Sequence, residues 1–320
     1  MRYGTEDWDE VVAALGDASE VALATHVNPD GDALGSLLAI ALGLAKLNKK
    51  VHPSLGASEN KVPASYAFLP GVDRLVGADE VPPTQAFVAL DCGAADRLGD
   101  LEDVARASDC LINIDHHPGN ESFGTLNVVV PTASSTAELV TRLLEDLGVD
   151  LDSDIATCLY VGVVTDTGRF QYENSSPDTL RLAADLIAYG VHVPSIALEV
   201  FESSPFGYLK LLGHVLERAT LFEDERFVYS WITLADLEDT GTTPADTEKL
   251  IDAVRGTRDA DVAAVFKEQE DGKFRVSLRS KGPVSVGEIA RAQGGGGHEL
   301  AAGFTADDIE SGVAIIKAAL

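Results

Sequence analysis

Eight acidic and imidazole side chains carry the strongest chemical signal in this sequence. They stand in four short segments, at or near the ends of apolar runs, in a chain with only 7 histidines. The set consists of His26, Asp30, Asp32, Asp91, Asp115, His116, His117 and Asp166. Carboxylate and imidazole groups together bind hard-to-borderline divalent ions such as Mn²⁺. If these side chains converge in space, they describe a two-metal site that hydrolyses phosphate esters.

The segment at residues 26–36 contains three of these groups in the pattern H-x-x-x-D-x-D. Pro29 and Gly31 favour a turn. Asp30 and Asp32 are two residues apart, so in an extended loop they share one face. The dipole of a following helix would favour the ionised form of Asp32. In an equally weighted alternative, both aspartates are only turn and cap residues.

The other three segments also contain candidate ligands, and two of them allow a structural interpretation as well. Asp91 ends an apolar run and could bridge two metal ions, or it could be a helix cap or a solvated loop acid. Three consecutive ionisable groups at 115–117 are costly to bury without metal or hydrogen-bond partners. Asp166 follows an apolar run and could be a ligand, or it could cap a turn before Gly168.

The elements that must position these groups alternate between strands and helices. Near-continuous apolar strands with helices between them indicate a mainly parallel sheet covered on both faces. Three of the four segments begin directly after a predicted strand, where open parallel sheets bind their ligands. The predicted strands are residues 21–25, 51–55, 87–90, 110–114 and 125–130, and the helices are residues 34–47, 134–147 and 155–164.

The helix at 134–147 begins with Ser135 and Glu138 in the capping-box pattern S-x-x-E. An ordinary cap is one interpretation. The other is a helix N-terminus that faces a phosphate.

The sequence changes in character near residue 220, where we expect a smaller α+β domain. We therefore divide the chain into a catalytic domain at 1–190, a helical linker at 191–219 and a substrate-binding domain at 220–320. The linker follows a helix at 177–188 and contains helices at 193–202 and 206–219. Strands are predicted at 226–232, 262–266 and 273–278, and helices at 244–254, 286–291 and 308–319.

Two features of the C-terminal part could bind an anion. Four consecutive glycines at 294–297 expose backbone amides that a ligand can approach closely. A flexible linker is the alternative, which the apolar run that follows disfavours. Arg279 and Lys281 place two of the scarce positive charges close together, in contact with an anion or simply in solvent.

The chain is strongly acidic: 52 acidic against 24 basic residues give its 320 residues a formal net charge of −28. Apolar residues make up 45%, enough for folded cores, so we favour adaptation to molar salt, where charge repulsion is screened. A haloarchaeal, cytoplasmic protein is our expectation. We expect neither a signal peptide nor a transmembrane helix. The three cysteines form no C-x-x-C pair and are expected to stay reduced.

Together these motifs resemble those of the DHH–DHHA1 phosphoesterase superfamily, which includes RecJ-like proteins. The resemblance covers nearly the whole chain and is strongest to the nanoRNase/pAp-phosphatase proteins. It rests on the motifs at His26–Ser36, Asp91, Asp115–His117, Thr165–Gly168 and Arg279–His298. All the signature positions are filled, so the resemblance implies an intact active site.

The resemblance also implies a role for each residue. His26 and Asp30 would hold one metal ion, and Asp32, His116 and Asp166 would hold the other, with Asp91 as the bridge. Both ions would be Mn²⁺, with Mg²⁺ or Co²⁺ as alternatives. His117 would contact the phosphate, and Asp115 would orient a histidine. The residues implied to bind substrate in the second domain are Arg279, Ser280, Lys281, Gly295, Gly296 and His298.

We predict short substrates, because the sequence shows neither a basic stripe nor residues for a further nucleic-acid-binding module. They would be RNA or DNA oligomers of a few nucleotides, pAp or linear dinucleotides such as pApA, cleaved to 5′-mononucleotides. The alternatives are a cyclic-di-AMP phosphodiesterase, a pyrophosphate or polyphosphate hydrolase, and a non-catalytic scaffold in a replication or repair complex. The resemblance also suggests a homodimer.

Overall fold

The protein divides into two compact units, Met1–Ser203 and Ser204–Leu320. The structure, a computed structural model, describes residues 7–57 and 60–320. Each unit has its own sheet and its own buried apolar core. The range 191–219, expected as a linker, is shared between the units: Ile196 and Val200 join a core of the first, whereas Leu211 and Val215 join a core of the second.

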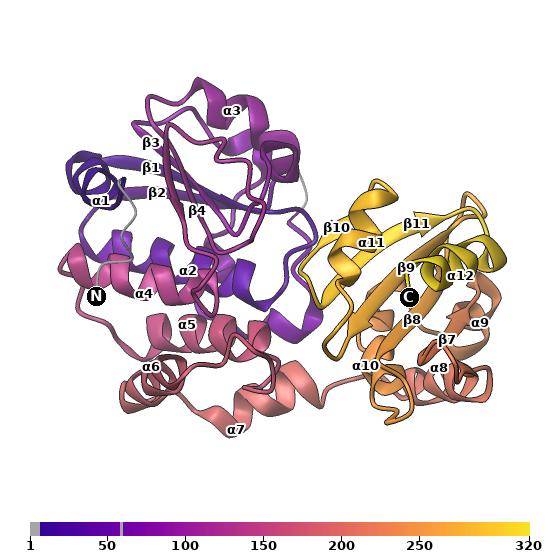
Figure 1. The fold of residues 1–320 in the computed structure, drawn as a ribbon. Helices are drawn as coiled ribbons and strands as arrows, with labels where there is room; N and C mark the ends of the chain where they lie inside the picture. The colour runs from indigo at the N-terminus through magenta and orange to yellow at the C-terminus, as the bar shows by residue number, and fades with distance from the viewer. Residues whose placement is uncertain (1–6, 58–59) are drawn as a thin grey trace. The chain divides into compact units, whose positions relative to one another are not determined.

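The first unit is built on a five-stranded parallel sheet with the order β2-β1-β3-β4-β5 (Figure 1). The prediction of a parallel α/β domain is thereby confirmed. All its strands run the same way, so their carboxyl ends meet at one edge of the sheet. The strands are β1 (Glu20–Thr25), β2 (Lys50–Ser54), β3 (Ala86–Leu90), β4 (Leu111–Asp115) and β5 (Leu126–Val129).

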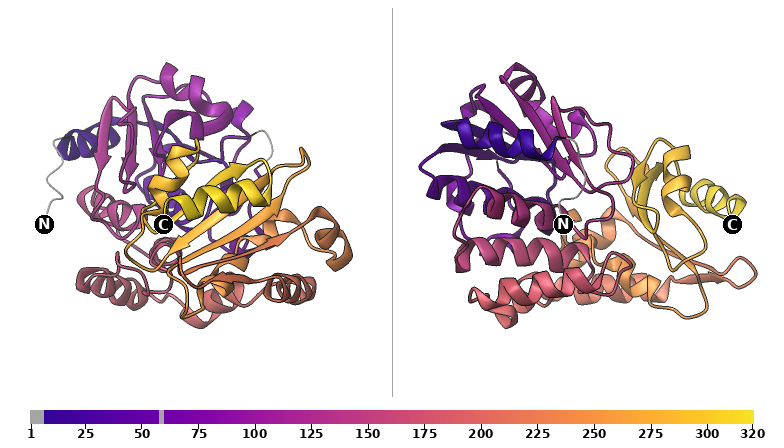
Figure 2. Two further views of the ribbon diagram at one scale, coloured as in Figure 1. Left: turned by 45° about the vertical axis from the view of Figure 1, so that its right-hand side comes forward. Right: turned by 60° about the vertical axis from the view of Figure 1, so that its left-hand side comes forward.

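Apolar cores cover both faces of this sheet. Side chains alternate along a strand, so Val21 and Leu23 enter the larger core while Ala22 and Ala24 enter the smaller one. Helices α1, α2, α4 and α5 contribute to the larger core, whereas η4 and α3 cover the opposite face (Figures 1 and 2). This double cover explains why the strands read as continuous apolar runs.

The helices of the first unit differ from the prediction mainly at their ends. Helix α2 begins at Gly31 rather than at residue 34, because the Asp30 side chain caps it. Helices α1 and α3 and the short helices η1 to η4 were not predicted, whereas α7 and η5 together fill the helix predicted at 193–202. The helices are α1 (Trp8–Asp17), α2 (Gly31–Lys46), η1 (Ala64–Tyr66), η2 (Val72–Arg74), η3 (Ala78–Glu80), η4 (Ala95–Leu101), α3 (Glu102–Ala107), α4 (Thr136–Asp146), α5 (Ser153–Asp166), α6 (Pro177–Ala188), α7 (Val193–Ile196) and the π-helical turn η5 (Ala197–Phe201).

Helices α2 and α5 pack so closely that glycine is required at their contact. A Cβ atom at Gly35 would lie 2.3 Å from the carbonyl oxygen of Cys158, and one at Gly162 would lie 2.8 Å from an oxygen of Asp32. The two helices therefore meet backbone to backbone. This contact matters for the site, because α2 carries Asp32 in its first turn and α5 ends at Asp166.

The second unit has a mixed six-stranded sheet with the order β10-β11-β9-β8-β7-β6, which confirms a mixed α+β domain. Only β7 and β8 pair in parallel; the other neighbours are antiparallel. The strands are β6 (Thr220–Phe222), β7 (Phe227–Ile232), β8 (Val262–Glu268), β9 (Phe274–Ser280), β10 (Gly296–Gly297) and β11 (Ala301–Ala306), and the helices are α8 (Phe206–Glu217), α9 (Leu234–Thr240), η6 (Pro244–Thr247), α10 (Leu250–Arg255), α11 (Val286–Ala292) and α12 (Ile309–Ala318).

The glycine run at 294–297 is part of this sheet. Gly296 and Gly297 form β10, which pairs with β11. A Cβ atom at Gly295 would lie 2.1 Å from the carbonyl oxygen of Gly303, so a side chain there would collide with the protein's own strand. Close approach within the sheet therefore already accounts for glycine at this position.

Within the described residues, no single helix is long and apolar enough to cross a membrane. The bent pair formed by α6 and residues 193–201, whose axes differ by 111°, reaches that length and composition only when its two parts are taken together.

Candidate metal centre

The loop between β1 and α2 places three of the predicted residues. His26 follows β1 directly and is buried. Its Nδ1 lies 2.9 Å from the carbonyl oxygen of Val27, which can only accept a hydrogen bond, so Nδ1 carries the hydrogen and Nε2 is left for a metal ion. Asp30 caps α2, since its Oδ1 accepts from the amides of Asp32 and Ala33 at 3.0 Å.

Asp32 is completely enclosed and bonded to the beginning of another helix. Its Oδ2 accepts from the amide of Thr136 at 2.6 Å, and its Oδ1 accepts from the amide of Ala137 at 2.9 Å. Both amides belong to the first turn of α4, where unpaired donors and the helix dipole favour an anion. The helix that we considered for binding a phosphate thus binds a carboxylate of the protein.

Asp91 lies directly after β3, in the left-handed region at φ 59°. Its side chain is 3% exposed, and its Oδ1 accepts a hydrogen bond from the hydroxyl of Thr136 at 2.9 Å. Three imidazoles surround the carboxylate: Nε2 of His26 at 3.6 Å, Nδ1 of His117 at 3.6 Å and Nε2 of His116 at 3.8 Å. Asp91 is therefore the common neighbour of all three candidate histidines.

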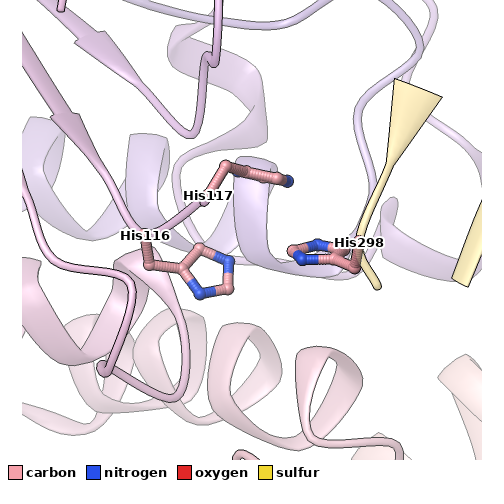
Figure 3. Close-up of side chains that lie close together, drawn as sticks. All are labelled: His116, His117 and His298. Carbon is pink, nitrogen blue, oxygen red and sulfur yellow. The ribbon is translucent and has the colours of Figure 1, made fainter. Parts of the chain in front are cut away.

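Asp115 is the last residue of β4, and the two residues that follow it, His116 and His117, supply two imidazoles from successive positions (Figure 3). Asp115 is fully buried, and its Oδ1 accepts from the amide of His116 at 2.8 Å and lies 2.7 Å from Nδ1 of His117. Its other oxygen accepts from the side-chain amide of Asn120. Nδ1 of His116 lies 3.3 Å from the carbonyl oxygen of Ala133, so its Nε2 faces the carboxylates.

Asp166 is the last residue of α5, and its Oδ2 lies 3.5 Å from Nε2 of His116. The side-chain amide of Asn174 donates to this carboxylate at 3.1 Å and to the carbonyl oxygen of Ser134 at 2.8 Å. Asn174 thereby ties the end of α5 to the segment before α4.

The donor atoms form two sets that share Asp91. One set is His26, Asp30 and Asp91, and the other is Asp32, Asp91 and His116; in each, the donor atoms lie within 4.8 Å of one another. Asp91, Asp115 and His117 form a third group of the same kind. Oxygen and imidazole nitrogen donors suit a divalent ion, and each histidine has its other ring nitrogen fixed by a backbone carbonyl or a carboxylate. The residues therefore fit a divalent metal ion.

The electrostatics of the cluster favour a cation as well. Burial, together with the charge of Asp91, raises the pKa of Asp32 and of Asp166 well above the ordinary value. Burial alone would also raise the pKa of Asp91, but the three imidazoles lower it overall. Several carboxylates this close and this shielded cannot all stay ionised by themselves. A bound cation would stabilise their ionised forms.

The pKa of His117 is raised to about 10. Burial opposes this shift, but the hydrogen bond with Asp115 and the charge of Asp91 outweigh it. The imidazole is therefore protonated at neutral pH in the protein without metal.

The residues predicted in the second unit gather at one end of its sheet. Arg279 lies opposite Ala301 in the β9–β11 pair, and the amide of Ser280 donates to the carbonyl oxygen of Leu300 at 2.9 Å. Ser280 is buried, whereas Lys281 is exposed and its ammonium donates to the carbonyl oxygen of Thr257. The His298 amide donates to the carbonyl oxygen of Ala301 at 2.8 Å. The cluster is thus formed within the second unit.

Sequence reasoning missed three residues that hold the ligand groups in place: Thr136, Asn174 and Asn120. Thr136 had a signal, because it stands beside the predicted cap Ser135 and its amide belongs to the helix N-terminus that we considered for anion binding. The sequence held no signal for the two asparagines. Their side chains reach Asp166 and Asp115 only when the loops between them fold back.

Comparisons with known proteins identify both units of the chain. Residues 20–163 match the N-terminal domain of the DHH family, and residues 224–320 match the DHHA1 domain. The chain is 35% identical over 286 residues to the bifunctional oligoribonuclease and PAP phosphatase NrnA of Thermus thermophilus, covering 89% of this chain and 83% of that protein.

Two solved structures resemble the fold. An exopolyphosphatase-related protein from Bacteroides fragilis has a TM-score of 0.89 at 26% identity, with 98% of this chain and 94% of that chain covered. The RecJ protein of Thermus thermophilus in complex with Mn²⁺ has a TM-score of 0.60 at 17% identity, covering 98% of this chain and 55% of that one, and is similar in fold.

Proposed function

The chain belongs to the DHH family of metal-dependent phosphoesterases, and from this membership we propose that it hydrolyses short oligonucleotides, and also pAp, to mononucleotides with two divalent metal ions. The observation that carries the proposal is the pair of donor sets that share Asp91. A carboxylate common to two sets suits two ions placed side by side, which is the arrangement used to cleave phosphate esters by in-line attack.

The proposed ligands divide as the donor sets do. His26 and Asp30 would hold one ion, Asp32 and His116 the other, and Asp91 would bridge them. Asp166 would complete the second set, which its 3.5 Å separation from Nε2 of His116 supports. The mixture of carboxylate and imidazole donors favours Mn²⁺ over Mg²⁺, because Mg²⁺ prefers oxygen donors alone.

The protein's own groups would prepare the reaction. When bound, the two ions would supply the Lewis acidity that activates a water and polarises the phosphoester. His117 is partly exposed beside the donor sets. Because its Nδ1 contacts Asp115, its Nε2 lies on the side of the ring away from that carboxylate. This ring nitrogen on the side away from Asp115 would donate a hydrogen bond to the phosphate as negative charge develops. Asp115 would act as the positioning residue for His117.

The substrate proposal rests on the relatives and on charge. The similar Thermus thermophilus protein is described as an oligoribonuclease and PAP phosphatase, which supports both short RNA and pAp. With 52 acidic and 24 basic residues, the sequence shows no basic stripe that would follow a long strand. Arg279, Ser280, Lys281, Gly295, Gly296 and His298 would bind the nucleotide that is released or its neighbour.

A product time course tests this proposal. Purified protein in molar KCl with Mn²⁺ would be given pApA, a short RNA, a long RNA, pAp and cyclic-di-AMP. We expect rapid release of mononucleotides from pApA and the short RNA, release of phosphate from pAp, and little change in the others. Preferred opening of cyclic-di-AMP would instead indicate turnover of a second messenger. Inactivity on every substrate with metal bound would indicate a scaffold.

Replacement of the shared carboxylate tests the metal assignment. In Asp91→Asn, we expect hydrolysis to fall by about 10³-fold or more, because both donor sets lose charge at once. Calorimetric titration with Mn²⁺ should show fewer ions bound per protein molecule than in the native protein. Asp96→Asn removes an exposed acid from the same segment and should leave both measurements unchanged. Full activity of Asp91→Asn would contradict the two-metal assignment.

A further inference from the structure

Three consecutive residues after α5 adopt the left-handed conformation. The φ angles are 55° at Gly168, 63° at Arg169 and 62° at Phe170. Glycine adopts this conformation easily, but residues with a side chain do so at a cost in free energy, and two in succession are rare. Strained backbone of this kind is maintained only where the surroundings enforce it, and it gathers at functional sites.

The surroundings enforce it here through contacts at both ends of the segment. The Arg169 amide donates to the carbonyl oxygen of Val164 at 2.8 Å, and the Phe170 amide donates to the hydroxyl of the buried Thr167 at 3.2 Å. Further along, the side chain of Asn174 returns to the carboxylate of Asp166. The segment is therefore a closed loop that begins and ends at a candidate metal ligand.

The strained conformation separates two neighbouring side chains. Phe170 packs against the large core of the first unit, whereas Arg169 is exposed. The Arg169 guanidinium carbon lies 5.2 Å from the ring centre of Phe201, close enough for a cation–π contact. Phe201 ends the π-helical turn η5, a kind of turn that is often found at functional sites. An aromatic ring and a fixed backbone thus hold this guanidinium.

No carboxylate within residues 7–57 and 60–320 forms an ion pair with Arg169. Arg74, Arg97, Arg275, Arg279 and Arg291 also form no ion pair with the described residues, so Arg169 differs from them by its fixed backbone and its aromatic contact. Several other arginines do pair with acids, including Arg106, Arg142, Arg181, Arg218 and Arg226. A guanidinium that is held in place but not neutralised is suited to bind an anion from solution.

We propose that Arg169 binds a non-reacting phosphate of the substrate, namely the 5′-terminal phosphate of a short oligonucleotide. This inference rests on the proposed function and adds a specificity-determining residue to it. An exposed guanidinium keeps part of its hydration, so its contact contributes similar binding to the substrate and to the transition state. Such uniform binding changes KM and leaves kcat nearly unchanged.

The experiment compares two substrates that differ by this one phosphate, pApA and ApA, in the Mn²⁺-loaded protein. In Arg169→Gln, we expect KM for pApA to rise by about tenfold with kcat nearly unchanged, because a charge-assisted contact is lost. KM for ApA should not change. Arg169→Lys should recover part of the affinity, since it keeps the charge and loses the planar fork. Arg142→Gln, which removes an arginine paired with Asp146 on α4, is the matched control and should behave as the native protein.

A second measurement is independent of turnover. Binding of a fluorescent, non-hydrolysable 5′-phosphorylated dinucleotide to the Mn²⁺-loaded protein would be compared by polarisation with and without Arg169→Gln, and the variant should bind about tenfold more weakly. Unchanged KM for pApA in Arg169→Gln, or equal losses on pApA and ApA, would overturn the proposal. These outcomes are distinct from failure of the proposed function, in which the native protein would hydrolyse neither substrate.

Discussion

At the scale of single residues, hydrogen bonds of the protein itself arrange the candidate ligands. Thr136 is the clearest case, because it touches both donor sets: its amide donates to Asp32 at 2.6 Å and its hydroxyl donates to Asp91 at 2.9 Å. Removing a hydrogen bond to a metal-binding side chain commonly weakens metal affinity by about tenfold or more. The first residue of α4 thus links the two halves of the site.

This arrangement makes Thr136→Val informative. Valine has nearly the same shape and keeps the amide, but it cannot donate to Asp91. We expect Mn²⁺ affinity to fall by about tenfold or more, measured by calorimetry, and activity at limiting Mn²⁺ to fall with it. Thr141→Val, on the same helix, removes a buried hydroxyl that donates to the carbonyl oxygen of Ala137 and should leave affinity unchanged. Equal affinities for the two variants would contradict the role of Thr136.

A second residue-scale case is Asp236 in the second unit, whose carboxylate is nearly buried. The guanidinium of Arg218 lies against both its oxygens, with Nη2 at 2.8 Å from Oδ1, and the amide of Thr233 donates to Oδ2 at 2.7 Å. The Arg218 hydrogen bonds, which outweigh burial, hold the pKa of Asp236 well below its ordinary value. Its ionised form therefore stabilises the folded state.

The sign of this shift predicts a pH dependence. Because the folded-state pKa is lowered, the stabilisation is complete above the unfolded-state pKa of about 4 and disappears as the pH falls through the folded-state pKa. Asp236→Asn should lower the free energy of unfolding by about 2 kcal/mol at pH 7. The difference in free energy of unfolding between the variant and the native protein should become smaller below about pH 4. Urea unfolding followed by Trp231 fluorescence in a Trp8→Phe background measures this.

Asp261→Asn is the matched control for Asp236. Asp261 also pairs with an arginine through both oxygens, but that pair with Arg226 is exposed. Exposed pairs contribute little because water screens them. The Asp261 variant should therefore lose less stability than the Asp236 variant, and the reverse order would show that shielding does not determine the effect.

At the scale of elements, the site depends on the distance between α2 and α5. Asp32 stands in the first turn of α2 and Asp166 at the last turn of α5, while glycines let the two backbones touch. A side chain at the contact would separate the helices that carry these two carboxylates. Packing between elements and geometry of the site are therefore coupled.

Gly35→Ala tests this coupling. The added Cβ atom would lie 2.3 Å from the carbonyl oxygen of Cys158, so the backbone must move. We expect a loss of about 1–3 kcal/mol in the free energy of unfolding and weaker Mn²⁺ binding in the protein that remains folded. Thermal unfolding and calorimetry measure the two effects.

Gly16→Ala is the control for Gly35. Gly16 lies near the end of α1, and a Cβ atom there would meet nothing within 4 Å. Alanine should keep or slightly raise stability, because glycine is unfavourable inside a helix. If both variants behaved alike, close packing of α2 against α5 would not be what requires glycine at position 35.

At the scale of the whole molecule, charge sets the conditions for folding. The net charge of −28 produces repulsion that weakens as salt shortens the screening length from about 10 Å at 0.1 M to about 3 Å at 1 M. Adaptation to high salt predicts that the midpoint of thermal unfolding rises by several degrees between 0.1 M and 2 M KCl. Calorimetric scans at fixed pH and Mn²⁺ would check this, and an unchanged or falling midpoint would contradict it.

The sequence by itself determined the order of the strands along the first unit and the positions of the candidate ligand groups after them. Apolar runs marked the five strands of the first unit because a sheet covered on both faces leaves little room for polar residues. His26, Asp91 and His116 could be expected to converge because parallel strands bring their carboxyl ends to one edge. These are local patterns, and a single segment of chain displays each of them.

Only the tertiary structure decided how the ligand groups are held. Asp32 pairs with helix α4 more than 100 residues away, and Asn174 returns to Asp166 through a loop. The run at 168–170 takes its left-handed form through contacts at both ends, and close approach to the segment of strand β11 requires glycine at 295 and 297. Each of these features is a contact between segments. A contact acts only after the chain has folded, so the pattern within either segment did not reveal it.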